Sequence, residues 1–155
     1  MTSKQPNSRN CFVCGVENAN GLKLKFYATA PGEVTSDINL PAQYQGYPGI
    51  VHGGIIAAML DEAAGRSQMG EASNPRFMFT ASLKVRYLKN VPVGQPLRLV
   101  GRAAETRGRV AQASSAIYDR EGNLLAEATA VLVNVPEETI AGVDLEALGW
   151  TVYPD

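Results

Sequence analysis

One long segment that is apolar on nearly every side lies among shorter segments of alternating polarity. Residues 54–69 read GIIAAMLDEAAGRSQM and are rich in helix formers. A helix without a polar face is stable only when other elements cover it. Two strand-like segments precede this helix and four follow it, an order that favours an α+β fold with an antiparallel sheet. The simplest such architecture is a curved sheet wrapped around one central helix.

The segments on either side of this helix alternate in polarity as half-buried strands do. The predicted strands cover residues 22–28, 34–40, 77–87, 97–105, 110–118 and 124–133. Strict alternation along the third of them places Phe79 and Leu83 on one face and Thr80 on the other, polar face. Arg107-Gly108 and residues 119–122 separate the last three strands and are typical of hairpin turns.

The chain has the length of one domain. Its 155 residues are too few for two well-buried domains. Residues 1–10 are polar, lack the apolar core of a secretion signal and are expected to form a mobile tail. Residues 11–135 are then the domain. Residues 136–155 are a C-terminal extension, with a short helix expected at 143–148 and Trp150 as a docking residue.

Composition argues against several classes of partner. Fourteen basic and fifteen acidic residues give a net charge of −1, so no basic excess favours nucleic acid or an anionic membrane. No run approaches the ~18 continuous apolar residues of a membrane span. Two cysteines cannot form a disulfide framework, which makes the cytoplasm the expected compartment. A single histidine, His52, excludes a multi-histidine metal site within one chain.

The tripeptide His52-Gly53-Gly54 lies where a loop enters the helix. Backbone N–H groups in the first turn of a helix have no internal partner, and the helix dipole adds partial positive charge there. Glycine lets a substrate approach this backbone closely. The tripeptide therefore fits an oxyanion that develops during attack on a carbonyl. A tightly packed glycine-rich helix entry without chemistry is the alternative interpretation.

Asp61 and Glu62 are neighbouring carboxylates within this otherwise apolar helix. Glu62 has Arg66 four residues later, so an ion pair on one helix face accounts for it. Asp61 has only small neighbours at the same spacings and no cation on its own face. Because an unpaired carboxylate in such a place is costly, Asp61 is favoured over Glu62 as the chemical group.

Gly53 and Asp61 are eight residues apart, which on one helix means about 12 Å along the axis. A nucleophile or base and an oxyanion donor must converge on one carbonyl. Two copies of the chain meet this requirement if their helices run antiparallel about a two-fold axis, each dimer then carrying two equal sites. The spacing therefore predicts an obligate homodimer.

The sequence resembles the hotdog-fold acyl-CoA thioesterases, most closely the phenylacetate-degradation (PaaI-like) type. The resemblance covers most of residues 11–133. It rests on four features: CFVCG at 11–15 followed by Gly21-Leu22, YQGYPGIVHGG at 44–54, the acidic residue nine positions after His52, and TASLKVRY at 80–87.

The resemblance implies a dimer, often a tetramer, that hydrolyses a thioester of coenzyme A (CoA) or of acyl carrier protein. It implies no cofactor beyond the CoA carried by the substrate. By position, Asp61 matches the catalytic carboxylate and Gly53 the backbone donor to the thioester carbonyl. His52 matches a positioning group, and Thr80 a hydroxyl that orients the attacking water. For Thr80 this requires a bulge or a twist at the start of the strand that turns its side chain toward the helix.

Five further residues are candidates for substrate contact: Gly54, Gln45, Tyr47, Arg107 and Arg109. Many relatives place Asn or Gln six residues before the histidine, where this chain has Gly46 and Gln45 comes one residue earlier. Tyr47 could line an acyl pocket or pack in the core. Arg107 and Arg109 flank a glycine turn and could bind CoA phosphates, or simply belong to a solvated sheet face.

Cys11 and Cys14 have the spacing of a metal-ligand pair. A structural zinc needs four ligands and only one pair is present, so a packing turn without a metal is expected.

Two other functions stay open. The first is a non-catalytic acyl-CoA binding or sensor protein of the same fold, which would bind acyl-CoA with negligible hydrolysis. The second is an acyl-thioester dehydratase or hydratase. Such enzymes need a base near the α- or β-carbon, commonly a histidine with an acidic partner. The one histidine abuts the glycine pair, which disfavours this second function.

Overall fold

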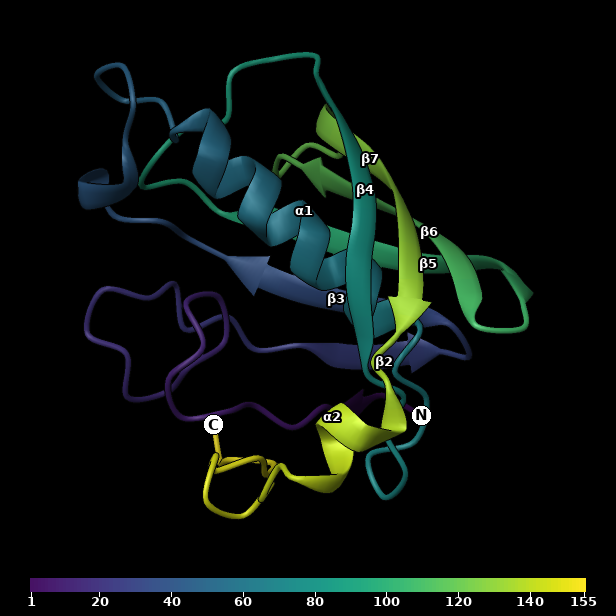
Figure 1. Ribbon diagram of the computed structural model, residues 1–155. Helices are drawn as coiled ribbons and strands as arrows, with labels where there is room; N and C mark the ends of the chain where they lie inside the picture. Colours follow the sequence, from purple (N-terminus) through teal and green to yellow (C-terminus); the bar gives the residue numbers. More distant parts are fainter.

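A seven-stranded antiparallel sheet curves around helix α1 in the computed structural model, which describes residues 1–155 (Figure 1). Helix α1 spans Gly53–Ser67. The strands are β1 (Ser3–Lys4), β2 (Tyr27–Ala30), β3 (Glu33–Ile38), β4 (Met78–Tyr87), β5 (Leu97–Arg107), β6 (Val110–Tyr118) and β7 (Leu124–Asn134). Their order in the sheet is β1-β2-β3-β5-β6-β7-β4. The α+β prediction, with one central helix inside an antiparallel sheet, is confirmed.

The core lies between the buried side of α1 and the concave face of the sheet. On the helix, Met59, Leu60 and Ala63 are fully buried. Small residues line the facing strand β7, where Ala126, Ala128 and Ala130 are buried. Ser115 of β6 donates a hydrogen bond to the carbonyl of Leu60 at 2.8 Å, which joins the middle of the helix to the sheet. This packing fixes which side of α1 remains open for a site.

Helix α1 passes closest to β5 at Gly101. A Cβ atom added there would overlap the Ala63 carbonyl oxygen and lie 2.6 Å from the carbonyl carbon. We expect Gly101→Ala to lower the free energy of unfolding by about 1–3 kcal/mol. The obstructing atoms belong to the Ala63 backbone, which cannot move aside as a flexible side chain can. Gly142→Ala is the control, since no atom lies within 4 Å of its added Cβ. Urea denaturation of both variants checks this, and equal midpoints would contradict the close crossing.

The N-terminal segment, expected as a mobile tail, is instead packed into the fold. Strand β1 pairs with β2, and Gln5 and Asn7 are buried. The Asn7 side-chain amide donates to the carbonyls of Cys14 (2.8 Å) and Leu24 (2.9 Å), and its backbone pairs with Thr151. The segment is held because its polar groups satisfy buried carbonyls that the sheet leaves unpaired.

The C-terminal residues also differ from the prediction. The short helix α2 spans Glu137–Ala141, not 143–148, since Pro136 at its N-cap and two glutamates in its first turn favour a helix start there. Trp150 does dock: its ring meets Phe77 edge-on at 5.4 Å between centroids. Both termini and α2 lie at the same end of the molecule (Figure 1).

The first predicted strand begins later than expected. Residues 22–26 are irregular, although Leu22, Leu24 and Phe26 are buried in alternation. Lys23 has a φ of 54°, in the left-handed region, and this single residue interrupts the extended run. Residues 22–26 therefore keep the alternating burial of a strand but not its backbone pairing with a neighbouring strand.

Among the helices, none has both the length and the apolar character needed to cross a membrane.

Candidate active site

The start of helix α1 leaves one backbone donor free. The His52 ring accepts a hydrogen bond at Nδ1 from the Gly54 N–H at 2.9 Å. The His52 carbonyl accepts from the N–H groups of Ile55 (3.0 Å) and Ile56 (3.1 Å). The Gly53 N–H is the first-turn donor that these bonds leave unused. The structure thus places His52 as the helix N-cap and Gly53 as the donor that points out of the helix end.

A hollow of about 400 Å³ lies beside this donor. It is lined by Gly46, Tyr47, Ile50, Val51, His52 and Gly53. A Cβ at position 46 would lie 3.2 Å from the His52 Cα, so a larger residue there would press on the capping histidine. Tyr47 is 80% exposed and lines the hollow, which places it at the rim and excludes the core-packing alternative for this residue.

Two of the expected substrate contacts are already engaged within the chain. The Gly54 N–H is taken by the His52 ring. The Gln45 side-chain oxygen accepts from the Gly49 N–H at 3.1 Å and so closes the loop before the helix. The Gly54 N–H can meet a substrate only by losing its bond to the His52 ring. The side-chain NH2 group of Gln45 has no partner and can still donate to a substrate.

Asp61 lies on the open side of α1 and is held by Thr80. The Thr80 hydroxyl donates to Asp61 Oδ1 at 2.6 Å. Strict alternation placed Thr80 on the polar face, and this prediction is wrong. A register shift between Thr80 and Ser82, opposite β7, inserts one extra residue and turns Thr80 toward the helix. The second oxygen of the carboxylate remains available for chemistry.

The neighbouring carboxylate behaves as predicted. Glu62 pairs with Arg66 at 2.8 Å, four residues along the helix. Burial raises the pKa of Glu62, and the Arg66 charge opposes this rise. Arg66 is only 2% exposed and also donates to the Pro6 carbonyl at 2.8 Å. Glu62 is therefore paired within the chain, whereas Asp61 has no cation beside it.

Asp61 and Thr80 line a second cavity, of about 220 Å³. None of the residues around the Gly53 hollow lines it. The two cavities lie along one helix, and Asp61 follows Gly53 by about 12 Å of helical rise. One chain therefore holds a free helix-terminal N–H and an unpaired carboxylate in two separate cavities.

The two candidate arginines are not near the Gly53 hollow of their own chain. Arg107 and Arg109 lie on the β5–β6 hairpin, and Arg107 pairs with Glu105 at 2.8 Å. This hairpin lies beside the C-terminal end of α1, where Gln68 donates to the Gln112 carbonyl.

Sequence reasoning missed one group of residues in the second cavity. Cys11 and Cys14 line it together with Glu62. Hydrogen bonding with the Cys14 side chain lowers the pKa of the Cys11 thiol to about 6, against the opposing effect of burial. Glu62 is distant from both cysteines in the sequence, so no spacing rule could have joined the three.

Comparison with known proteins identifies the family to which this chain belongs. The model of the thioesterase superfamily matches residues 48–126, just over half of the chain, which include Gly53, Asp61 and Thr80. The chain therefore belongs to the thioesterase superfamily. It is 29% identical over 134 residues to the acyl-coenzyme A thioesterase THEM4 of Rattus norvegicus, covering 85% of this chain and 56% of the relative. The chain thus spans little more than half the length of this relative.

Solved structures agree with the fold. A crystal structure of a thioesterase superfamily protein is 30% identical with a TM-score of 0.74, covering 81% of this chain and 63% of that chain. The Escherichia coli PaaI protein of the phenylacetic acid degradation operon has 13% identity and a TM-score of 0.66, with coverages of 74% and 81%. A Streptococcus mutans UA159 protein bound to acetyl CoA has 20% identity and a TM-score of 0.65, with coverages of 72% and 88%. The last two likenesses concern the fold alone.

Proposed function

We propose that this protein hydrolyses an acyl-CoA thioester in a site shared by two copies of the chain. One observation carries the proposal: a free helix-terminal N–H at Gly53 and a Thr80-oriented carboxylate at Asp61 lie on one helix, in separate cavities. The acyl-coenzyme A thioesterase among the relatives and the acetyl CoA bound by a protein of the same fold support the substrate class.

The two half-sites have complementary chemistry. The thioester carbonyl oxygen would accept from the Gly53 N–H, and the positive end of the helix dipole would stabilise the charge that develops there. Asp61 of the other subunit would either remove a proton from water or attack the carbonyl and form an anhydride. In both routes the carbon–sulfur bond breaks, water supplies the hydroxyl of the free acid, and the thiol of CoA leaves. Thr80 would hold the carboxylate in place.

The surface beside Asp61 has the features of an interface with a second copy. Strand β4 is a ten-residue edge strand, most of its residues are exposed, and Phe79 and Tyr87 are among them. A long edge strand of this kind is a template for pairing. Next to it, α1 presents an incompletely buried row of Gly54, Ala57, Asp61 and Gly65. Antiparallel contact along this row would bring each Asp61 to the partner's Gly53.

The same arrangement assigns roles to the remaining candidates. In an antiparallel pair, the C-terminal end of one α1 lies near the N-terminal end of the other. The hairpin arginines, Arg107 and Arg109, would then reach the hollow at the partner's Gly53 and bind CoA phosphates. His52 would position the Gly53 donor, and Tyr47 at the rim would contact the acyl group.

The test is a hydrolysis panel of aromatic, short-chain and medium-chain acyl-CoAs, read as release of free thiol, with acyl carrier protein thioesters in parallel. We expect turnover of at least one acyl-CoA well above the rate without protein. Tight binding of acyl-CoA without thiol release would overturn the proposal in favour of a sensor of the same fold.

A further inference from the structure

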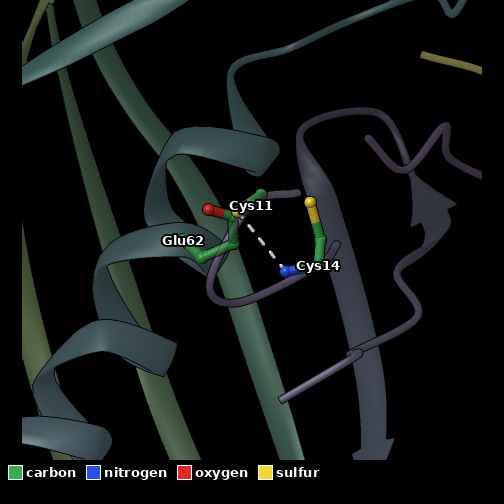
Figure 2. Close-up of side chains that lie close together, drawn as sticks. All are labelled: Cys11, Cys14 and Glu62. Carbon is green, nitrogen blue, oxygen red and sulfur yellow. Dashed lines mark hydrogen bonds between the residues drawn. The ribbon is translucent and has the colours of Figure 1, made fainter. Parts of the chain in front are cut away.

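Three side chains of types that can bind a metal converge where the N-terminal loop meets helix α1. The thiol sulfurs of Cys11 and Cys14 and a carboxylate oxygen of Glu62 all lie within 4.8 Å of one another (Figure 2). The expectation of a packing turn without a metal rested on the presence of only one ligand pair. The fold supplies a third ligand from the helix, which changes that conclusion.

The loop around the cysteines is shaped to hold a charged sulfur. The N–H groups of Val13 (3.3 Å) and Cys14 (3.4 Å) both donate to the Cys11 sulfur. The Gly15 N–H donates to the Cys11 carbonyl at 2.8 Å. A Cβ at Gly15 would lie 2.6 Å from the Cys11 nitrogen, so only glycine fits this turn. Two backbone donors on one sulfur favour the thiolate, which is the form that binds metals.

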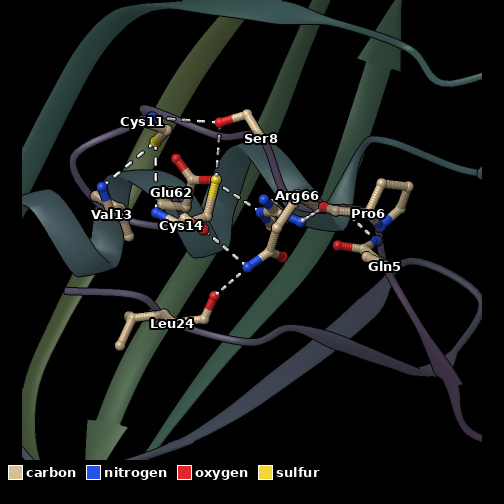
Figure 3. A network of polar contacts seen from close by, with 10 residues as sticks. Gln5, Pro6, Ser8, Cys11, Val13, Cys14, Leu24, Glu62 and Arg66 are labelled. Atoms are coloured by element: carbon tan, nitrogen blue, oxygen red, sulfur yellow. Dashed lines mark hydrogen bonds and ion pairs between the residues drawn. The ribbon is translucent and has the colours of Figure 1, made fainter. Parts of the chain in front are cut away.

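The charges around the three ligands balance when a divalent cation is present. Two thiolates and one carboxylate carry three negative charges, a divalent cation supplies two positive charges, and Arg66 supplies the third. Arg66 pairs with Glu62 (Figure 3). It is only 2% exposed, and its Nη2 atom has no hydrogen-bond partner. Because a buried net charge is costly, this balance favours the fully loaded cluster.

The donor set also selects the kind of metal. Two sulfurs and one carboxylate oxygen suit zinc and its neighbours among the transition metals, whereas calcium and magnesium take oxygen ligands. Zinc accepts four ligands, and the cavity of about 220 Å³ beside the cluster leaves room for water as the fourth.

We propose that Cys11, Cys14 and Glu62 form a binding site for a divalent transition metal, zinc above all, which fastens the N-terminal loop to helix α1. The two cysteines lie outside residues 48–126, the span that matches the superfamily. Glu62, by contrast, lies within that span and next to Asp61. The proposed metal takes no part in the proposed hydrolysis, so either proposal can fail without the other. Because metal affinity becomes folding free energy, the metal should stabilise the whole domain.

The experiment uses the reduced full chain, stripped of metal with a chelator and titrated with zinc against a chromogenic competitor. We expect about one zinc per chain, protection of both thiols from a thiol reagent, and a higher Tm with zinc than with chelator. Cobalt in place of zinc should give thiolate-to-metal charge-transfer absorption. A wild-type protein that binds no stoichiometric zinc, or leaves both thiols reactive in its presence, would overturn the proposal whether or not any variant folds.

Variants identify the ligands. Cys11→Ser and Cys14→Ser should each abolish stoichiometric zinc binding. Glu62→Gln should weaken it roughly tenfold or more, since the amide loses the charge that the metal needs. Asp61→Asn is the matched control, one residue away in the same cavity, and should bind zinc as the wild type does. Equal zinc affinity of Glu62→Gln and wild type would refute the third ligand.

Discussion

Replacing Asp61 by Asn should lower kcat for acyl-CoA hydrolysis by roughly 100- to 10,000-fold, the range that a positioned general base contributes. The substitution removes the negative charge and keeps the shape. An Asn side-chain oxygen can still accept the Thr80 hydroxyl, which now meets Asp61 Oδ1 at 2.6 Å, so the fold and the dimer should persist. The measurement is thiol release at saturating substrate, with circular dichroism and light scattering on the same preparation.

Asp37→Asn is the control for this result. Asp37 is also an aspartate, but its side chain is 76% exposed on β3 and pairs only with Arg98. An exposed pair of this kind contributes little, so activity should stay near that of the wild type. Hydrolysis by Asp61→Asn at the rate of the wild type would show that another group does the chemistry.

The sequence was sufficient to predict the features that depend on local pattern. An apolar helix among alternating strands determines the layer arrangement, because only a surrounding sheet can cover it. The place of His52 at the helix entry and the pairing of Glu62 with Arg66 are likewise local, whereas the capping bond from the Gly54 N–H to the His52 ring was not predicted. The spacing of Gly53 and Asp61 followed from helix geometry alone.

Features that depend on tertiary contacts were beyond a single-sequence prediction. The direction of Thr80 depends on a bulge, and one inserted residue reverses the face of everything before it. The packing of residues 3–7 depends on buried carbonyls from distant loops. The approach of Cys11 to Glu62 depends on how the N-terminal loop folds over α1. In each case the deciding contact comes from another segment of the chain, which no local pattern reveals.

The Gly53 donor can be removed without disturbing the helix. Gly53→Pro deletes the N–H at the first helical position, where proline is favoured. His52 has a φ of −58° and a ψ of 136°, the extended conformation that a residue before proline requires. We expect a loss of about 100- to 1,000-fold in kcat, as for one oxyanion donor. Gly53→Ala keeps the N–H, and its Cβ would lie 3.6 Å from the Tyr87 ring, an ordinary contact, so it should remain active.

Combining the two inactive variants tests whether the site is shared between subunits. A heterodimer of one Gly53→Pro chain and one Asp61→Asn chain, purified through two different tags, should recover about half of the wild-type activity, because two-fold symmetry then leaves one of two sites intact. That intact site joins the unaltered Gly53 of one chain to the unaltered Asp61 of the other. If both groups acted within one chain, each chain of the heterodimer would be defective and activity would stay at the level of the separate variants. Recovery therefore depends on the antiparallel pairing of α1 that brings the two half-sites together.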